Sequence, residues 1–186
     1  YAGDDPDAFV TKLNAAGVHQ WTNTFGSTYS VIGWSVAVDG SGNVHVTGRF
    51  RGTSDFGAGN VSAGGSFNVF VTKLNSSGAH QWTNTYGGMR SEQGRDVAVD
   101  GSGNVYVTGY FSGTVNFGAG NVTSAGNADV FVTKLNSSGA HQWTTTFGSN
   151  GHDQGHGVAV DGSGNVYVTG NFWVTVNFGA GDVTSA

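Results

Sequence analysis

The chain lacks cysteine, contains one proline among 186 residues, and carries charge on only 10% of its residues. The absence of cysteine excludes disulfide bridges and thiolate metal sites. So few charged residues argue against a disordered chain, and the net charge of −5 argues against a nucleic-acid partner. No apolar run is long enough to span a membrane, and no signal peptide is recognisable. The chain begins at Tyr1 rather than Met, which indicates a processed form or a part of a longer chain.

The residues that are abundant favour β-structure. Glycine occurs 33 times without the every-third spacing of collagen, so the glycines are interpreted as turn residues. Aromatic residues make up 12% of the chain, and together with recurrent valine and threonine they favour strands. No segment of useful length has helical periodicity, so we expect an all-β fold.

The chain is a repeat of one 61-residue unit. The segment Val10–Asn14 (VTKLN) returns as Val71–Asn75 and again as Val132–Asn136, with no insertion or deletion between the copies. A fixed period of this kind indicates one structural unit that packs against its own copies.

Each unit is predicted to form four short antiparallel strands, named A to D. In the middle copy these are A (Asp96–Asp100), B (Asn104–Phe111), C (Asp129–Asn136) and D (His141–Gly148), with tight glycine-rich turns between A and B and between C and D. Tryptophan at positions 21, 82 and 143 is expected in the core between units, and histidine at 19, 80 and 141 is expected to form hydrogen bonds at the sheet edge. One such sheet cannot bury both of its faces alone, and radial packing of several sheets in a β-propeller solves this problem.

The unit VAVDGSGNVYVTG…DVFVTKLNSSGAHQW resembles the bacterial β-propeller repeats called SBBP and, more distantly, the NHL repeats. The resemblance covers the whole chain and is most specific in the hairpin Asp100–Asn104. It implies four-stranded propeller blades, a bacterial protein that is secreted or attached to the cell surface, and no common catalytic residue.

Three units fall below the usual four to eight blades of a propeller. The expected division is residues 1–33 (strands C and D of a split blade), 34–94 (a blade), 95–155 (a blade) and 156–186 (strands A and B of the split blade). We expect a second copy of the chain to close a six-bladed ring, in which Phe9–Gly26 of one chain completes the blade begun by residues 156–182 of the other. Three chains with nine blades, or a longer natural chain, are the alternatives.

The copies differ mainly in the D–A and B–C connections, which emerge on the same side of the unit. We call this side the variable face, and the opposite side, with its invariant turns, the uniform face. The variable face carries large aromatic and cationic side chains of the types that dominate binding energy at interfaces, which favours recognition over neutral drift. The predicted ligand-binding residues are Tyr29, Trp34, Arg49, Arg51, Arg90, Glu92, Arg95, Tyr110, His152, Asp153, His156, Asn171 and Trp173.

Catalytic and metal sites are weakly indicated. The turn Asp39–Asn43 resembles the start of a calcium loop but lacks its later acidic ligand, so we expect Asp39 only to hold the hairpin. His152 and His156 flank Asp153 in a single copy only, and we expect neither a metal nor another cofactor.

The sequence therefore predicts a non-enzymatic recognition or scaffold propeller that binds a glycan or a protein through the variable face. Two alternatives stay open. One is a purely structural, self-assembling propeller (a ring or filament subunit, or a designed repeat protein), and the other is a lyase or glycosidase that uses the mouth of the channel.

Overall fold

The computed structural model describes residues 5–186, and every regular element in this part of the chain is a β-strand. The long strands are β1 (Ala8–Leu13), β2 (His19–Phe25), β3 (Val31–Val38), β4 (Val44–Phe50), β7 (Asn68–Leu74), β8 (His80–Tyr86), β9 (Gln93–Val99), β10 (Val105–Phe111), β13 (Asp129–Leu135), β14 (His141–Phe147), β15 (Gln154–Val160) and β16 (Val166–Asn171). The short strands are β5 (Thr53–Asp55), β6 (Asn60–Ser62), β11 (Thr114–Asn116), β12 (Asn121–Thr123), β17 (Thr175–Asn177) and β18 (Asp182–Thr184). No helix in the described residues has the length and hydropathy needed to cross a bilayer.

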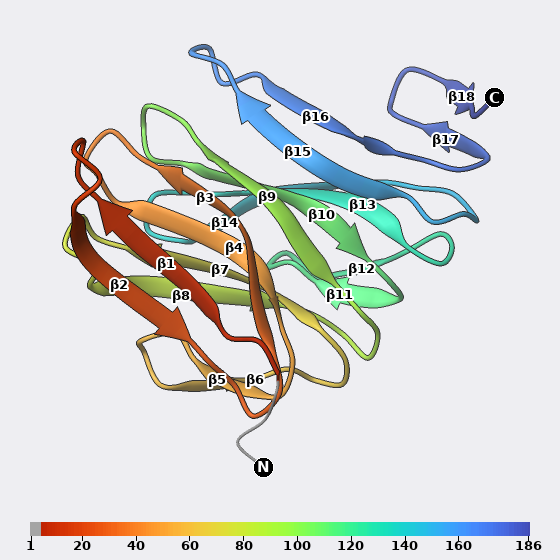
Figure 1. Cartoon of the computed structure of the whole chain (residues 1–186). Helices are drawn as coiled ribbons and strands as arrows, with labels where there is room; N and C mark the ends of the chain where they lie inside the picture. Colours follow the sequence, from red (N-terminus) through yellow and green to blue (C-terminus); the bar gives the residue numbers. More distant parts are fainter. Residues whose placement is uncertain (1–4) are drawn as a thin grey trace.

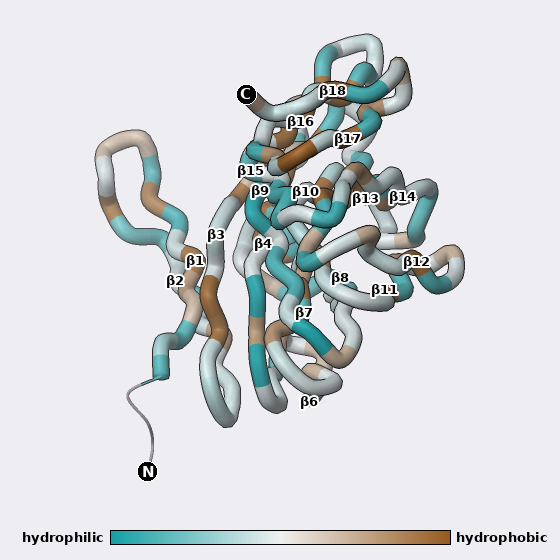
Figure 2. The backbone as a smooth tube through the Cα atoms, turned by 90° about the vertical axis from the view of Figure 1, so that its right-hand side faces the viewer, coloured by the Kyte–Doolittle hydropathy of each residue, from teal (hydrophilic) through white to brown (hydrophobic). Residues whose placement is uncertain are grey.

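The strands form two complete sheets and two half-sheets. Strands β3-β4-β7-β8 and β9-β10-β13-β14 form four-stranded antiparallel sheets in the order A-B-C-D, as predicted. The β1–β2 hairpin consists of strands C and D alone, and the β15–β16 hairpin consists of strands A and B alone. Figure 2 shows these half-sheets at two ends of the molecule, with the complete sheets between them.

The observed strands differ from the predicted ones in two respects. Strand A of the middle unit begins at Gln93 rather than at Asp96, because Gln93 and Gly94 continue the ladder with Tyr110 and Gly109 beyond a bulge. The long B–C connection contains a further hairpin, β11–β12, in which the hydroxyl groups of Thr114 and Thr123 lie 2.8 Å apart.

The A–B turn is held by its aspartate. Asp39 Oδ1 accepts hydrogen bonds from the backbone N–H groups of Ser41 (2.9 Å) and Asn43 (3.0 Å), and Oδ2 accepts one from the Asn43 amide (2.8 Å). Burial alone would raise the pKa of Asp39, but hydrogen bonds from Asn43, Ser41 and His45 outweigh it and lower the pKa to about 2. The interpretation of this turn as an aspartate-held hairpin is confirmed.

The innermost strands of neighbouring sheets lie side by side. Strand β9 packs against β3 on one side and against β15 on the other (Figure 1). Asp96 links all three, because Oδ1 accepts a hydrogen bond from the hydroxyl of Ser35 (2.5 Å) and Oδ2 accepts one from the backbone N–H of Val158 (2.8 Å). The small strand A therefore occupies the inner position predicted for it.

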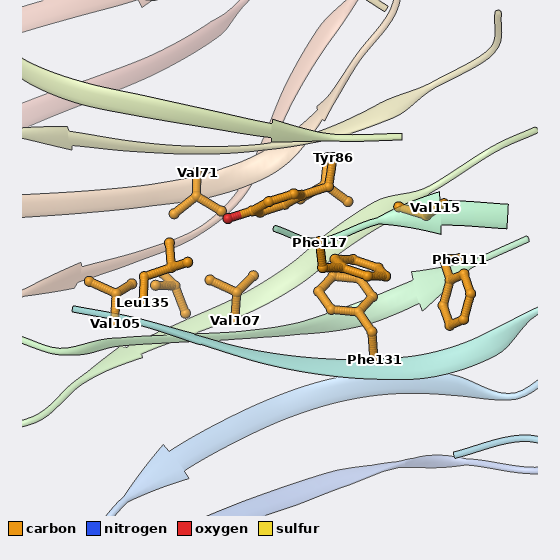
Figure 3. Close-up of a cluster of buried hydrophobic side chains, with 11 residues drawn as sticks. Val71, Tyr86, Val105, Val107, Phe111, Val115, Phe117, Phe131 and Leu135 are labelled. Carbon is orange, nitrogen blue, oxygen red and sulfur yellow. The ribbon is translucent and has the colours of Figure 1, made fainter. Parts of the chain in front are cut away.

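The core lies between the sheets. Figure 3 shows side chains of β7 and β8 facing those of β10, β11 and β13 across the gap between the two complete sheets. Each gap contains a cluster of four aromatic rings, here called a ring quartet. The first quartet is Phe25, Phe50, Phe56 and Phe70, and the second is Tyr86, Phe111, Phe117 and Phe131.

The repeated tryptophan lies between sheets at the margin of the core, where Trp21 and Trp82 are partly buried against the two core clusters. Trp21 is half-buried, packs over Gly78 and donates its indole N–H to Ser76 O (3.2 Å) in the C–D turn of the next sheet. Trp82 makes the same bond to Ser137 O (3.3 Å). The indole keeps its N–H hydrogen-bonded in this way, which a position deep among phenyl rings would not allow. The repeated histidines bond to a threonine on the same strand, as His19 does with Thr22 (2.9 Å), in agreement with the prediction.

One buried histidine allows a test based on the repeat itself. His45 is fully buried, its Nδ1 has no hydrogen-bond partner, and burial lowers its pKa, so the ring is neutral at pH 7. Tyr106 occupies the same place in the next unit, where its hydroxyl donates to Asp100 (3.0 Å).

We expect His45→Tyr to raise the free energy of unfolding by about 1 kcal/mol, because it removes an unsatisfied buried nitrogen and replaces the long hydrogen bond from His45 to Asp39 (3.4 Å) with a shorter one from the tyrosine hydroxyl. Thermal unfolding should show a midpoint roughly 2–4 °C higher for a chain of this size. The reverse change, Tyr106→His, should lower the midpoint. A midpoint lowered by His45→Tyr would contradict the explanation.

Candidate functional site

The D–A and B–C connections are hydrogen-bonded to each other on the variable face. Backbone bonds join Arg51 N–H to Ser30 O (2.9 Å), Glu92 N–H to Phe67 O (2.8 Å) and Asp153 N–H to Ala128 O (2.8 Å). The two kinds of variable connection therefore form one surface rather than separate flexible loops.

A β-bulge in each strand A places one variable side chain on this surface. In β9, Gly94 pairs with Gly109 and Asp96 pairs with Thr108, so Arg95 is the extra residue of the bulge. Trp34 in β3 and His156 in β15 are extra in the same way. A bulge changes the direction in which a side chain points and is common beside functional sites.

Invariant glycines fix the shape of the bulge. A Cβ atom on Gly109 would lie 1.8 Å from Gln93 O, and one on Gly94 would lie 2.2 Å from Thr47 Oγ1. No side chain fits at either place, and both glycines occur in all three units. The extra residue of the bulge, in contrast, is Trp, Arg or His.

Five side chains of the variable face form a continuous row across three units, which we call the aromatic–arginine row. Its members are Trp34, Arg95, Tyr110, His152 and Trp173. The guanidinium of Arg95 lies over the ring of Trp34 (4.8 Å) and near the ring of Tyr110 (5.7 Å). Tyr110 meets His152 edge-on (5.7 Å between ring centres), and His152 meets Trp173 edge-on (6.2 Å). The row ends in two indoles, which are 44% and 50% exposed in the single chain.

All four arginines of the chain belong to the variable face. Besides Arg95, they are Arg49, which lies over Phe67 (4.1 Å), Arg51, which lies over Tyr29 (5.1 Å), and the exposed Arg90. Among residues 5–186 no carboxylate lies within 4 Å of any of them, since the carboxylate contacts of basic side chains found there are those of Lys73 and the neutral His45 with Asp39 on the uniform face.

Two segments of the chain match the family model described as the SBBP β-propeller repeat, namely residues 90–113 and 142–171. The prediction of SBBP-type repeats is confirmed for these two segments, which together make up less than a third of the chain. Both matched segments include a bulge and the strand B beside it, and they contain Arg95, Tyr110 and His152 of the row.

Two curated proteins are similar to the chain. The chain is 25% identical over 204 residues to the uncharacterized WD repeat-containing protein L264 of Acanthamoeba polyphaga mimivirus, with 90% of the chain and 14% of that protein covered. It is 29% identical over 166 residues to the regulatory protein FlaEY of Caulobacter vibrioides, with 86% of the chain and 17% of that protein covered. The chain spans less than a fifth of the length of either relative.

Two predicted ligand-binding residues require correction. Glu92 and Asp153 are fully buried beneath the variable face of their SBBP units and present no surface to a ligand. Asp153 accepts hydrogen bonds from the backbone N–H groups of Ser149 (2.7 Å) and Trp173 (2.8 Å), so it joins the D–A and B–C connections. Val31 is the equivalent residue of the first unit, and its side chain is also fully buried. Residues at this position therefore support the loops and do not contact a ligand.

Of the remaining predicted residues, Arg51 lies over Tyr29 (5.1 Å), and the side chain of Arg90 lies near Gly113. His156 bonds through Nε2 to Asn171 Oδ1, and His152 bonds through Nδ1 to the amide of Gln154 (3.0 Å). These bonds, together with the burial of Asp153, separate the two histidines from the aspartate. Within the described residues no three histidine, aspartate or glutamate side chains lie where they could share a metal ion.

The sequence prediction missed Phe67, which supports the guanidinium of Arg49. A signal was available, because the equivalent positions are Pro6 and Ala128, so this residue varies between units as the other surface residues do. It was missed because Phe67 immediately precedes β7, where an aromatic residue is easily taken for core.

Proposed function

We propose that these SBBP repeats form a non-enzymatic recognition module that binds a glycan or a protein through the variable face. The observation that carries this proposal is the aromatic–arginine row, because its members come from three units yet touch one another in sequence. Drift in unrelated loops gives no reason for such continuity. Exposed tryptophan, tyrosine and arginine held on a rigid frame are the usual sources of binding energy at interfaces.

The names of the two relatives agree with this proposal. One is described as WD repeat-containing and the other as regulatory, and neither description refers to catalysis. Both proteins are far longer than this chain, so the comparison supports only the general class of function.

The experiment is a screen on glycan and protein arrays, followed by the variant in which Trp34, Arg95 and Trp173 are all replaced by alanine. Each of these truncations is expected to cost about 1–2 kcal/mol of binding free energy, so the combined variant should bind at least roughly 100-fold more weakly. Ser102→Ala, on the uniform face, is the control and should bind as the unchanged chain does. Undiminished binding by the triple variant would remove the row from the proposal.

We further propose that the module is completed by a second copy of the chain. A third set of rings, Phe147, Phe172 and Phe178, repeats the geometry of the ring quartets but has three members. The repeat places Phe9 in the fourth position, and in the single chain Phe9 is 67% exposed while Phe70 and Phe131 are fully buried.

The repeat also predicts how the two half-sheets pair. In the complete sheets β4 pairs with β7 and β10 pairs with β13 in the same register, for example Val105 with Leu135. Applied to the split blade, this register pairs Val166 of one copy with Leu13 of the other. A groove of about 650 Å³, lined in part by Phe9, Leu13 and Trp34, is open in the single chain, and strands A and B of the other copy are proposed to occupy it. Two chains joined twice in this way give six blades, and three chains would give nine.

A further inference from the structure

The positions of the charged side chains indicate that the ligand is acidic. This inference rests on the proposed recognition function. The chain has a net charge of −5, yet every arginine is on the variable face. The lysines are on the other side of the molecule, where Lys12 and Lys73 donate to the carbonyl groups of Ser76 (3.0 Å) and Ser137 (3.1 Å) in C–D turns. The variable face is therefore a cationic surface on an acidic protein.

Two of these guanidinium groups are close enough to repel each other. Burial lowers the pKa of Arg49, and of its charged neighbours Tyr110 raises this pKa while the positive charge of Arg95 lowers it. The buried Nε of each of these arginines has no acceptor within the described part of the chain. Two cations held together without an anion are destabilising, and a bound anion would relieve both the repulsion and the unmet hydrogen bonds.

The carboxylates nearest to this surface do not neutralise it. Glu92 is buried, and burial raises its pKa to about 7, so a large fraction is uncharged near neutral pH. Asp153 is buried beneath the loops, where its oxygens accept hydrogen bonds from Ser149 and Trp173. An acidic ligand would therefore meet arginines with no competing carboxylate in contact with them.

The aromatic members of the row favour a sugar chain over an acidic peptide. Trp34 and Trp173 are both about half exposed, at the two ends of the row, and an indole presents a flat apolar face of the kind that packs against C–H groups. The arginines lie between and beside these rings. Along the row, Arg95 lies between the ring of Trp34 and three further rings, which suits a ligand that offers both apolar faces and acidic groups on one chain.

We propose that the aromatic–arginine row, with Arg49 beside it, binds an acidic polysaccharide, whose carboxylate or sulfate groups pair with Arg49 and Arg95 while its sugar rings stack on the indoles. A carboxylate and a sulfate group each offer a pair of anionic oxygens that a guanidinium can bind with two parallel hydrogen bonds.

The test is the binding of the full chain to four immobilised probes, which are polygalacturonate, dextran sulfate, neutral dextran and polyglutamate. We expect binding to polygalacturonate, dextran sulfate or both, no binding to neutral dextran, and weaker binding as salt is raised. The two acidic polysaccharides distinguish carboxylate from sulfate recognition. Polyglutamate reports a preference for acidic peptides.

Three variants separate specific binding from ion exchange. Arg49→Gln combined with Arg95→Gln should weaken binding at least about ten-fold, whereas Lys134→Gln, which removes a charge away from this face, should not. Trp34→Ala combined with Trp173→Ala keeps every charge and should also weaken binding about ten-fold. Circular dichroism and the thermal midpoint check that each variant is folded.

Several results would overturn the inference. These results are equal binding to neutral dextran, stronger binding to polyglutamate than to the acidic polysaccharides, and no binding to any of the four probes. Binding that either double variant leaves unchanged would also overturn the inference. A neutral glycan or a protein found on the arrays, lost in the triple alanine variant, would leave the recognition proposal standing while this inference fails.

Discussion

Replacing Phe9 with aspartate will leave the chain monomeric, whereas the unchanged chain will be a dimer by light scattering at micromolar concentration. Phe9 is the residue that the repeat assigns to the empty place in the third ring quartet, beside Phe147 and Phe178 of the other copy. An aspartate there would place an unpaired carboxylate among phenyl rings, a cost of several kcal/mol at each of the two junctions.

The expected stability of the dimer follows from the apolar side chains of the two half-sheets that are exposed to solvent in the single chain. Tyr167 is 58% exposed and Leu13 is 54% exposed, while their equivalents Tyr106 and Leu135 are almost completely buried. Covering a side chain of this kind contributes about 1.5–3 kcal/mol, and several are covered at each junction. Pairing of β16 with β1 would also remove two open sheet edges.

Met89→Asp is the matched control, because Met89 is 84% exposed on the variable face and lies outside both half-sheets. It introduces the same charge and should leave the dimer intact. A dimer that survives Phe9→Asp would refute the assigned register. A strict monomer formed by the unchanged chain would refute self-completion, and the complementary half would then have to come from another repeat of a longer protein.

The repeat made most of the fold predictable. Identical segments such as Val71–Asn75 and Val132–Asn136 must adopt the same structure, so one interpretation with four strands applied to the whole chain. The inner place of strand A was predictable from its small and β-branched side chains, and Asp96 explains how three such strands are held together.

The bulge was not predictable, although it is the feature that builds the site. Strand prediction rests on alternation of side chains, and one inserted residue simply looks like the end of a strand. Gly94 and Arg95 therefore fall outside the predicted strand, which begins at Asp96, whereas Gly94 pairs within the sheet and Arg95 alone is extra. The site itself was located by comparison of the units, since that comparison shows where side chains change even when it does not show why they point outward.

Burial was the other quantity that the sequence did not reveal. Val31, Glu92 and Asp153 occupy the same position in successive units, and a change from valine to an acid resembles surface variation. All three side chains are fully buried. The chemistry of the two acids differs only in how many donors surround each, and this difference leads to opposite expectations for two similar substitutions.

Glu92→Gln is expected to stabilise the chain above neutral pH by about 3 kcal/mol, and to have little effect near pH 4.5. Glu92 accepts a hydrogen bond from the backbone N–H of Gly88 (3.1 Å), but its buried Oε1 has no partner. Burial therefore raises the pKa of this carboxyl from 4.5 to about 7 in spite of hydrogen bonds from Gly88 and Ser112. A change of this size corresponds to about 3 kcal/mol.

The direction follows from proton linkage. Between pH 4.5 and 7 the folded chain keeps a proton on Glu92 that the unfolded chain has released, so the free energy of unfolding falls as pH rises through this window and levels off above it. Glutamine has no proton to lose, so the variant should lack this decline. His45, whose pKa burial lowers, acts in the opposite sense below pH 6.5, but it is present in both chains and cancels in their difference.

The measurement is urea unfolding of both chains from pH 4.5 to 8, at a fixed chain concentration because association also stabilises the folded state. The difference in unfolding free energy should grow from near zero to about 3 kcal/mol, and a difference that stays constant with pH would contradict the explanation.

Asp153→Asn is the matched comparison at the same position of the next unit. Its carboxylate accepts hydrogen bonds from Ser149 N–H, Ser149 O–H and Trp173 N–H, and an amide that points its own N–H₂ at one of these donors loses a bond and adds a clash of donors. That variant should lose about 1–3 kcal/mol at pH 8, where Glu92→Gln gains. Opposite signs from the same acid-to-amide change at equivalent positions would show that the number of donors around a buried carboxylate, not burial alone, decides whether its charge stabilises the variable face.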